Sequence, residues 1–327
     1  MYSEIQKYLG QTWKQFQKMF ADRLTSEISA LNKINGYLGE RAGKQLRPTL
    51  TLLTARALRG FCNENVVRCA AAVEMLHTAT LLHDDVADDS PVRRGSPTIR
   101  SMYSPTTSVL IGDFWLSRAI ETIVGYCDER VVRIFALSLQ MLAEGEMIQL
   151  EKAESLDTTE EDYYRIIYRK TASLFEAAIM SAAFSVKATQ GEIEAFQQYA
   201  CHLGLTFQIV DDILDYSPEL NLGKPTGQDI LEKKITLPLF GLIKNAPKSV
   251  VSELFQRMRQ VGTDSKADAL LAADAVSLVK QYGGLEYAAG YAEKETSLAI
   301  DSLSIIPDSQ EKSYLIELAG HMAVRTR

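Results

Sequence analysis

Proline is absent from the middle of this chain of 327 residues, because all nine prolines lie at or before Pro105 or at or after Pro218. A proline inside a helix removes a hydrogen bond and clashes with the preceding turn, so this stretch is free to form long helices. Apolar residues recur there at spacings of three and four, as in VVRIFALSLQMLAEGEMIQL at 131–150. No segment alternates polar and apolar residues as a hairpin strand would, which predicts an all-α protein.

Cysteine is also scarce, and the four cysteines show no CxxC spacing, which disfavours a zinc site or a disulfide framework and indicates reduced thiols. No apolar run approaches the roughly 20 residues that span a bilayer, so no transmembrane segment is expected. The N-terminal sequence MYSEIQKYLGQTWKQ lacks the apolar region of a secretory signal, which favours a cytoplasmic location. The net charge of −7 disfavours a nucleic-acid partner, because phosphate backbones are bound by dense basic patches.

The predicted helices are organised as a bundle. Those at 69–89 and 171–188 are apolar on more than one face, which is typical of helices in the middle of a bundle. Two capping-box patterns mark helix starts: Thr158-x-x-Glu161 and Thr189-x-x-Glu192. No repeat, low-complexity segment or linker marks a boundary, so the sequence predicts one domain over 1–327.

Two segments, LLHDDVAD and FQIVDDILD, share one arrangement of acidic residues. Each has three aspartates at positions i, i+1 and i+4, namely Asp84, Asp85 and Asp88 in the first and Asp211, Asp212 and Asp215 in the second. On a helix the first and last of each triad lie on one face, and like charges there destabilise the helix by about 0.2–0.5 kcal/mol. A hard divalent cation would compensate this charge, and Mg²⁺ typically takes one or two carboxylates together with water and phosphate oxygens. The triads therefore predict magnesium sites that face one shared space.

Basic residues accompany both triads. Arg93 and Arg94 follow the first triad, and Lys224, Lys233 and Lys234 follow the second. Further basic groups stand in GKQLRP, with Gly43, Lys44 and Arg47, and in Lys170-Thr171. Because arginine and lysine are suited to phosphate contacts, the combination of acidic triads and basic residues predicts a substrate that carries polyphosphate groups.

At these motifs the chain resembles the trans-isoprenyl diphosphate synthases, and within them the long-chain polyprenyl synthases of the octaprenyl type. The matching strings are GKQLRP, HTATLLHDDVADDSPVRRG, SVLIGDF, AEGEMIQL, YRKTASLFEAA, GLTFQIVDDILDY and GKPTGQDILEKKITLPL. The resemblance implies the isoprenoid synthase fold, a bundle of long antiparallel helices around a central cavity, assembled as a homodimer. It also implies a prenyltransferase that adds isopentenyl diphosphate repeatedly to an allylic diphosphate, with Mg²⁺ as cofactor.

The resemblance implies roles for individual residues. All six aspartates would be metal ligands. The groups implied at the allylic diphosphate are Arg93, Lys170, Thr171, Gln208, Lys224 and Lys234. Those implied at isopentenyl diphosphate are Gly43, Lys44, Arg47, His77 and Arg94. The implied catalytic groups are Lys170, Lys224, Arg93, Asp84 and Asp211. One departure concerns the second basic cluster, where Lys233 replaces the usual glycine beside Lys234.

Product length is expected to depend on the helix turn that precedes Asp84. One turn is about 5.4 Å, close to the length of one isoprene unit. In this family a bulky aromatic residue there stops growth, whereas this chain has Ala79 and Thr80, with Leu76 a further turn away. We therefore expect a product longer than geranylgeranyl diphosphate, with octaprenyl diphosphate as the best single candidate.

Three alternatives stay open at this point. A farnesyl or geranylgeranyl synthase is disfavoured by the small residues Ala79 and Thr80. A terpene cyclase would share the fold but lack the second DDxxD and the GKxxRP motif. A regulatory subunit of a two-component synthase would have degraded aspartate motifs, although this chain could still be a catalytic subunit that needs a partner.

Overall fold

The computed structural model describes residues 1–93, 95–218 and 226–324. Within these ranges the chain is helical, apart from two short antiparallel strands, β1 (Val92–Arg93) and β2 (Ser96–Pro97). This confirms the predicted all-α class. No described helix combines the length and apolar character that crossing a bilayer requires.

The chain divides into two compact units, each built from three segments. Unit 1 comprises Met1–Leu137, Glu176–Gln197 and Ile305–Leu315, and unit 2 comprises Ser138–Phe175, Gln198–Ser304 and Ile316–Arg327. The single domain over 1–327 stays a prediction.

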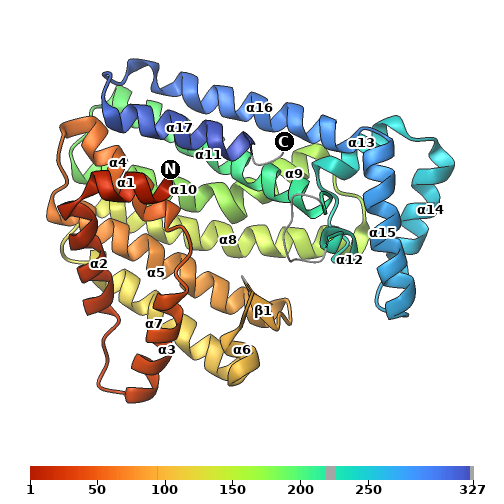
Figure 1. Ribbon diagram of the computed structural model, residues 1–327, viewed down its shortest axis with the longest axis horizontal. Coiled ribbons are helices and arrows are strands. Elements are labelled where there is room, and N and C mark those ends of the chain that lie inside the picture. The colour runs from red at the N-terminus through yellow and green to blue at the C-terminus, as the bar shows by residue number, and fades with distance from the viewer. Residues whose placement is uncertain (94, 219–225, 325–327) are drawn as a thin grey trace. The chain divides into compact units, whose positions relative to one another are not determined.

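Unit 1 contains α5 (Glu64–Ala87), the helix that carries the first aspartate triad. Its helices outside the shared segments are α1 (Tyr2–Leu9), α2 (Gln11–Arg23), α3 (Ser29–Glu40), α4 (Leu46–Arg59), α5 (Glu64–Ala87), α6 (Ile99–Met102) and α7 (Pro105–Ile123) (Figure 1). The helices α5 and α7 pack along each other. The Ser108 hydroxyl donates to the Leu82 carbonyl, and a Cβ atom at Gly112 would lie 2.3 Å from Nε2 of His83. The glycine of the SVLIGDF motif thus permits the close approach of α7 to α5.

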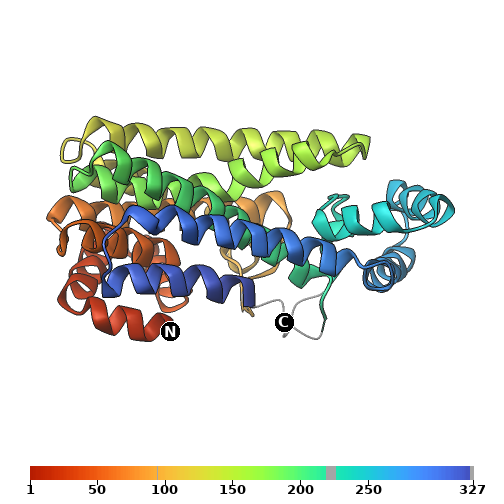
Figure 2. The ribbon, with the colours of Figure 1, turned by 90° about the horizontal axis from the view of Figure 1, so that it is seen from above.

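Unit 2 contains the second triad and a group of C-terminal helices. Its helices outside the shared segments are α9 (Glu160–Ile167), α12 (Gln228–Leu231), α13 (Leu237–Asn245), α14 (Lys248–Arg259), α15 (Ser265–Gln281) and α16 (Gly284–Ser302), followed by a 3₁₀ turn (Leu303–Ile305). The helices α14 and α15 pack beside each other (Figure 2), and α13 packs on α16. One buried cluster joins α9, α11, α13 and α16 through side chains such as Tyr163, Ile209 and Leu237.

Four of the five boundaries between the units fall within the helices α8 (Glu129–Ser155), α10 (Ser173–Ser185), α11 (Gln190–Asp215) and α17 (Gln310–Val324), and the fifth falls within the 3₁₀ turn, between Ser304 and Ile305. The capping box at Thr189 and Glu192 is confirmed, because each backbone N–H is bound by the other residue's side chain. The other capping box is formed by Thr159 and Asp162, so the prediction of Thr158 and Glu161 was wrong by one residue.

Candidate active site

A cavity of about 280 Å³ in unit 1 lies beside the C-terminal half of α5. Four predicted site residues line it together: Gly43, His77, Asp85 and Arg93. They come from the segment before α4, from α5 and from β1. The fold thus brings part of the GKQLRP motif next to the first aspartate triad.

Asp85 and Arg93 form an ion pair in this cavity. Nε of Arg93 donates to Oδ1 of Asp85 at 2.6 Å, and the Asp85 side chain is only 5% exposed. Burial raises the pKa of Asp85, and the hydrogen bond and charge of Arg93 oppose this shift without cancelling it. Removing a carboxylate from water disfavours its charged form, so a further cation would stabilise Asp85.

The other two members of the first triad lie at the end of α5. Asp84 belongs to its last turn, and Asp88 follows the helix with its N–H donating to the Asp84 carbonyl at 2.8 Å. Asp84 is half-buried and Asp88 is exposed. The triad thus ends the helix, as the sequence predicts.

The other residues predicted to bind isopentenyl diphosphate are Lys44, Arg47 and Arg94. Within the described part of the chain, Lys44 and Arg47 are not among the residues that line this cavity. Arg47 is buried at the start of α4, and the Lys44 ammonium lies 5.0 Å from the centroid of the Tyr2 ring. Arg94 lies outside the described residues. The shared role of these three residues stays a prediction.

The residues predicted to control product length are all buried in α5. Leu76 and Ala79 are 1% exposed and Thr80 is 8% exposed. The Thr80 hydroxyl donates to the His77 carbonyl at 2.8 Å, which ties it to its own helix. Their effect on product length stays a prediction.

Several residues of this cavity were missed from the sequence. Tyr37, Arg41, Glu74 and Thr98 also line it. The Arg41 guanidinium lies 3.8 Å from the centroid of the Tyr37 ring, and the Tyr37 hydroxyl donates to the Pro97 carbonyl. Glu74 is one turn before His77 on α5, so helical spacing from the histidine could have found it.

A second cavity, of about 100 Å³, lies within unit 2. Four predicted site residues line it: Lys170, Gln208, Asp212 and Lys234. They come from the turn after α9, from α11 and from the segment after α12. This cavity therefore joins the middle carboxylate of the second triad to two of the predicted diphosphate-binding lysines.

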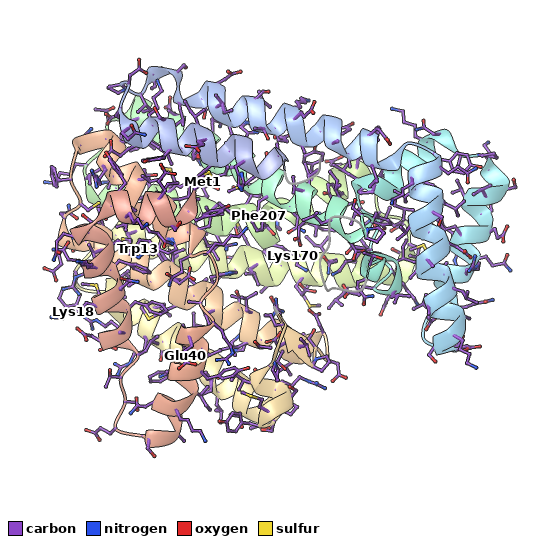
Figure 3. All side chains as sticks on the ribbon, in the orientation of Figure 1. Met1, Trp13, Lys18, Glu40, Lys170 and Phe207 are labelled. Carbon is purple, nitrogen blue, oxygen red and sulfur yellow. The ribbon has the colours of Figure 1, made fainter. Side chains whose placement is uncertain are left out.

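A π-helical turn positions Lys170. The residues Tyr168–Ala172 form this turn between α9 and α10, and such wide turns often occur at functional sites. A Cβ atom at Gly145 of α8 would lie 2.8 Å from Cγ of Lys170, so this glycine lets α8 approach the turn (Lys170 is labelled in Figure 3). Nζ of Lys170 then contacts Glu146 at 2.5 Å and Gln149 at 3.0 Å. The AEGEMIQL motif thereby holds the lysine in place.

A chain of hydrogen bonds leads from the π-helical turn to the second triad. The Thr171 hydroxyl donates to Oε1 of Gln208 at 2.6 Å, and Nε2 of Gln208 donates to Oδ1 of Asp212 at 2.8 Å. The Tyr163 hydroxyl donates to the other oxygen of Asp212 at 2.5 Å. Both carboxylate oxygens of Asp212 are thus fixed by neutral donors. Tyr163 was not among the residues predicted from the sequence.

Burial dominates the electrostatics of Asp212. Burial and the negative charge of Asp211 raise the pKa of Asp212, to about 7. The hydrogen bonds from Tyr163 and Gln208 and the positive charge of Lys234 lower this pKa, but they do not cancel the effect of burial. Asp212 is 5% exposed. A carboxylate held this far from water by neutral donors is well suited to a cationic ligand.

The other acidic groups of unit 2 differ in exposure and partners. Asp211 is exposed, whereas Asp215 accepts the N–H groups of Gln228 and Asp229 at 3.1 and 3.0 Å and so caps α12. Burial raises the pKa of Asp215, and it raises that of Asp229 strongly. Asp229 also lines the cavity and was missed, although it lies in the GKPTGQDIL motif.

Both lysines of the EKK segment line the unit 2 cavity. Lys233 adopts φ 57°, a left-handed conformation that favours glycine, which explains why glycine is usual at this position in the resembled family. Lys234 forms an ion pair with Glu232, and its charge lowers the pKa of both Asp212 and Asp229. Lys224 lies outside the described residues.

The donor set fits magnesium bound together with a diphosphate. Among the described residues, no three acidic, histidine or cysteine side chains converge into a ready-made metal site. Mg²⁺ seldom needs one, because substrate phosphate oxygens and water complete its shell. Oδ2 of Asp229 is buried without a hydrogen bond, and the negative charge of the nearby Asp212 adds to the rise in the pKa of Asp229 that burial causes. A divalent cation would relieve this repulsion.

The chain is similar in sequence to a known protein family over most of its length. The model of the family described as "Polyprenyl synthetase" matches residues 28–272. The octaprenyl diphosphate synthase of Haemophilus influenzae is 36% identical over 317 residues, which are 97% of this chain and 94% of that protein.

Two solved structures share the fold over nearly the whole chain. The crystal structure of a decaprenyl diphosphate synthase from Rhodobacter capsulatus is 34% identical, with a TM-score of 0.92 and full coverage of both chains. A polyprenyl synthase from Caulobacter crescentus, complexed with calcium and isoprenyl diphosphate, is 32% identical, with a TM-score of 0.90 over 100% of this chain and 98% of that chain. The predicted isoprenoid synthase fold is thus confirmed.

Proposed function

The chain belongs to the polyprenyl synthetase family and is a prenyltransferase, and we propose that it adds isopentenyl diphosphate repeatedly to an allylic diphosphate to give a long-chain all-trans polyprenyl diphosphate. Its proposed place of action is the cytoplasm, with no nucleic-acid partner. The observation that carries the proposal is the unit 2 cavity, in which Asp212 of the second triad and Lys170, held by the π-helical turn, line the same space.

The residues of this cavity suit an allylic diphosphate. Lys170 and Lys234 provide positive charge. Gln208 and Tyr163 donate to the two carboxylate oxygens of Asp212, and Thr171 donates to Gln208. Positive groups aimed at the departing diphosphate stabilise the charge that develops as its bond to the allylic carbon breaks. We assign this role to Lys170 and Lys234, together with Arg93 and Lys224.

The aspartates would hold the metal and would not attack the substrate. Magnesium, when bound, supplies charge stabilisation for the departing diphosphate. The residues proposed to hold it are Asp84, Asp85, Asp88, Asp211, Asp212 and Asp215. The ion pair of the buried Asp85 with the half-buried Arg93 keeps one carboxylate of the first triad in a fixed orientation.

The isopentenyl double bond then attacks the allylic cation, and a proton is lost to the released diphosphate. The GKQLRP segment and His77 are proposed to hold the isopentenyl diphosphate, since Gly43 and His77 line the unit 1 cavity with Arg93. Water must be kept away from the allylic cation, because a water molecule would react with the cation before the isopentenyl double bond does.

The proposed main product is octaprenyl diphosphate. Relatives of similar identity include an octaprenyl and a decaprenyl synthase, so family membership alone leaves the length open. The small side chains of Ala79 and Thr80 support a product beyond geranylgeranyl diphosphate, because neither forms an aromatic barrier one turn before Asp84.

A product assay tests the proposal. The purified chain, incubated with Mg²⁺, farnesyl diphosphate and labelled isopentenyl diphosphate, should form long-chain products, and Lys170→Ala should lower this rate by at least an order of magnitude. Lys248→Ala, which removes an exposed lysine of α14, is the matched control and should leave the rate unchanged. Equal rates for Lys170→Ala and the control would overturn the role of Lys170, and no incorporation by the wild type would overturn the activity.

We also propose that the chain forms a homodimer through α7. Val109, Leu110 and Ile120 of this helix are 37%, 61% and 44% exposed, so α7 presents apolar side chains to solvent. A second copy of the chain is the proposed occupant, because isologous contacts bury the same patch twice. Leu110→Glu should shift the mass measured by light scattering from dimer to monomer, and a monomeric wild type would contradict this.

A further inference from the structure

Two cysteines of unit 1 lie together where the turn after α7 packs on the first turns of α5. Cys69, in α5, is fully buried, whereas Cys127 follows α7 and is half-buried. The two thiols are close enough for each to shift the pKa of the other. Neither thiol takes part in the chemistry proposed above.

The residues that precede these cysteines place the two segments against each other independently of the thiols. The Arg68 guanidinium lies 3.9 Å from the centroid of the Tyr126 ring. One turn earlier in α5, Nδ2 of Asn65 donates to the Tyr126 carbonyl at 2.9 Å. Two contacts between the same two segments thus hold the turn that carries Cys127 against the part of α5 that carries Cys69.

The two thiols differ in a way that assigns them separate roles. The hydrogen bond from Cys69 lowers the pKa of Cys127, and the charge of Arg68 acts in the same direction. The hydrogen bond to Cys127 and complete burial raise the pKa of Cys69. Because the thiolate is the reactive form, the partly exposed Cys127 is suited to react first and the buried Cys69 second.

We propose that Cys127 and Cys69 form a reversible disulfide by exchange with a low-molecular-weight disulfide such as oxidised glutathione. The Cys127 thiolate attacks one sulfur of glutathione disulfide, which forms a mixed disulfide and releases one glutathione thiolate. Cys69 then attacks the Cys127 sulfur, its proton passes to the departing second glutathione, and the internal disulfide is complete. The protein loses two hydrogens, and one glutathione disulfide is reduced to two thiols.

This disulfide would join α5, which carries the first aspartate triad at its other end, to the turn after α7. The inference does not rest on the proposed prenyl transfer, because neither cysteine lines either cavity described above. Cys62, also in unit 1, offers an internal comparison. Its thiol donates to the Leu52 carbonyl, and burial raises its pKa to about 12, so it should remain an unreactive thiol.

Mass spectrometry of the native full-length protein tests the proposal. After incubation with oxidised glutathione and acid quenching, the wild type should lose two hydrogens and yield a linked peptide pair that contains Cys69 and Cys127. Dithiothreitol should restore the reduced mass. Cys69→Ser should stop at the mixed disulfide and gain one glutathionyl group on Cys127, whereas Cys62→Ser should behave as the wild type does.

Three outcomes would overturn the proposal. In the first, the wild type stops at the mixed disulfide on Cys127, as Cys69→Ser is expected to do. In the second, the wild type reacts first at Cys62, and in the third it does not react with oxidised glutathione at all. The peptide map of the wild type decides the matter even if Cys69→Ser fails to fold.

Discussion

Replacing Asp212 with asparagine should remove much of the pH dependence of stability of the metal-free protein. Burial raises the pKa of Asp212 from 3.8 to about 7, so the folded chain binds this proton more tightly than the unfolded chain does. Protonation therefore stabilises the fold. This contribution is fully present below the unfolded pKa near 3.8, and it is lost as the pH rises through about 7.

The size of the effect follows from the shift. About three pKa units, at about 1.4 kcal/mol each, correspond to about 4 kcal/mol between acidic and mildly alkaline pH. Burial also raises the pKa values of Asp215 and Asp229, so these residues add a trend of the same sign. Asp212→Asn carries no titrating proton and should flatten the wild-type trend without abolishing it.

The assay is thermal unfolding in EDTA from pH 5 to pH 8, a range over which most of this proton should dissociate. The melting temperature of the wild type should fall by several degrees over this range, and that of Asp212→Asn should fall much less. Asp211→Asn makes the same substitution at the exposed neighbour and should keep most of the wild-type trend. Parallel curves for the wild type and Asp212→Asn would refute the reasoning.

Three further substitutions test separate parts of the site. Ala79→Tyr should shorten the main product towards farnesyl or geranylgeranyl length in a chromatographic product assay, and an unchanged product would count against Ala79 as the barrier position. Tyr163→Phe removes a hydrogen bond to the Asp212 carboxylate, worth about 1.5–3 kcal/mol, and should lower kcat/KM for the allylic diphosphate roughly tenfold to a hundredfold. A wild-type kcat/KM would show that this bond does not position Asp212. Gly145→Ala places a methyl group 2.8 Å from Cγ of Lys170 and should destabilise the fold by about 1–3 kcal/mol in denaturant titrations; an unchanged midpoint would contradict the close approach.

The helical class could be predicted from the sequence because it depends on local signals. The proline-free middle of the chain and the apolar spacing at 131–150 do form helices, and the first triad ends α5 where the pattern places it. Helix starts were less certain, since Thr159 caps α9 although Thr158 also has an acidic residue three positions later. Both threonines have an acidic residue three positions later, so the spacing alone does not distinguish them. The geometry of the turn decides which threonine caps the helix.

The positions of the triad members could be predicted only in part. Helical spacing places Asp211 and Asp215 on one face, yet Asp211 is exposed, Asp215 caps α12 and the middle carboxylate Asp212 lines the cavity. Which face is buried depends on the neighbouring helices, and spacing within one helix does not contain that information.

The supporting residues could not be predicted because they depend on tertiary contacts. Tyr163 is 49 positions from Asp212 in the sequence, and its hydroxyl reaches the carboxylate only through the packing of α9 on α11. The π-helical turn at Lys170 likewise has no local pattern that distinguishes it from an ordinary helix.

The most direct test of the central claim measures incorporation of isopentenyl diphosphate by the Asp84→Asn and Asp212→Asn variants across a magnesium titration. If these carboxylates help to hold the metal with the diphosphate, both variants should require much higher Mg²⁺ concentrations and should lose at least an order of magnitude in maximal rate. Wild-type rates at wild-type magnesium concentrations in both variants would contradict the account.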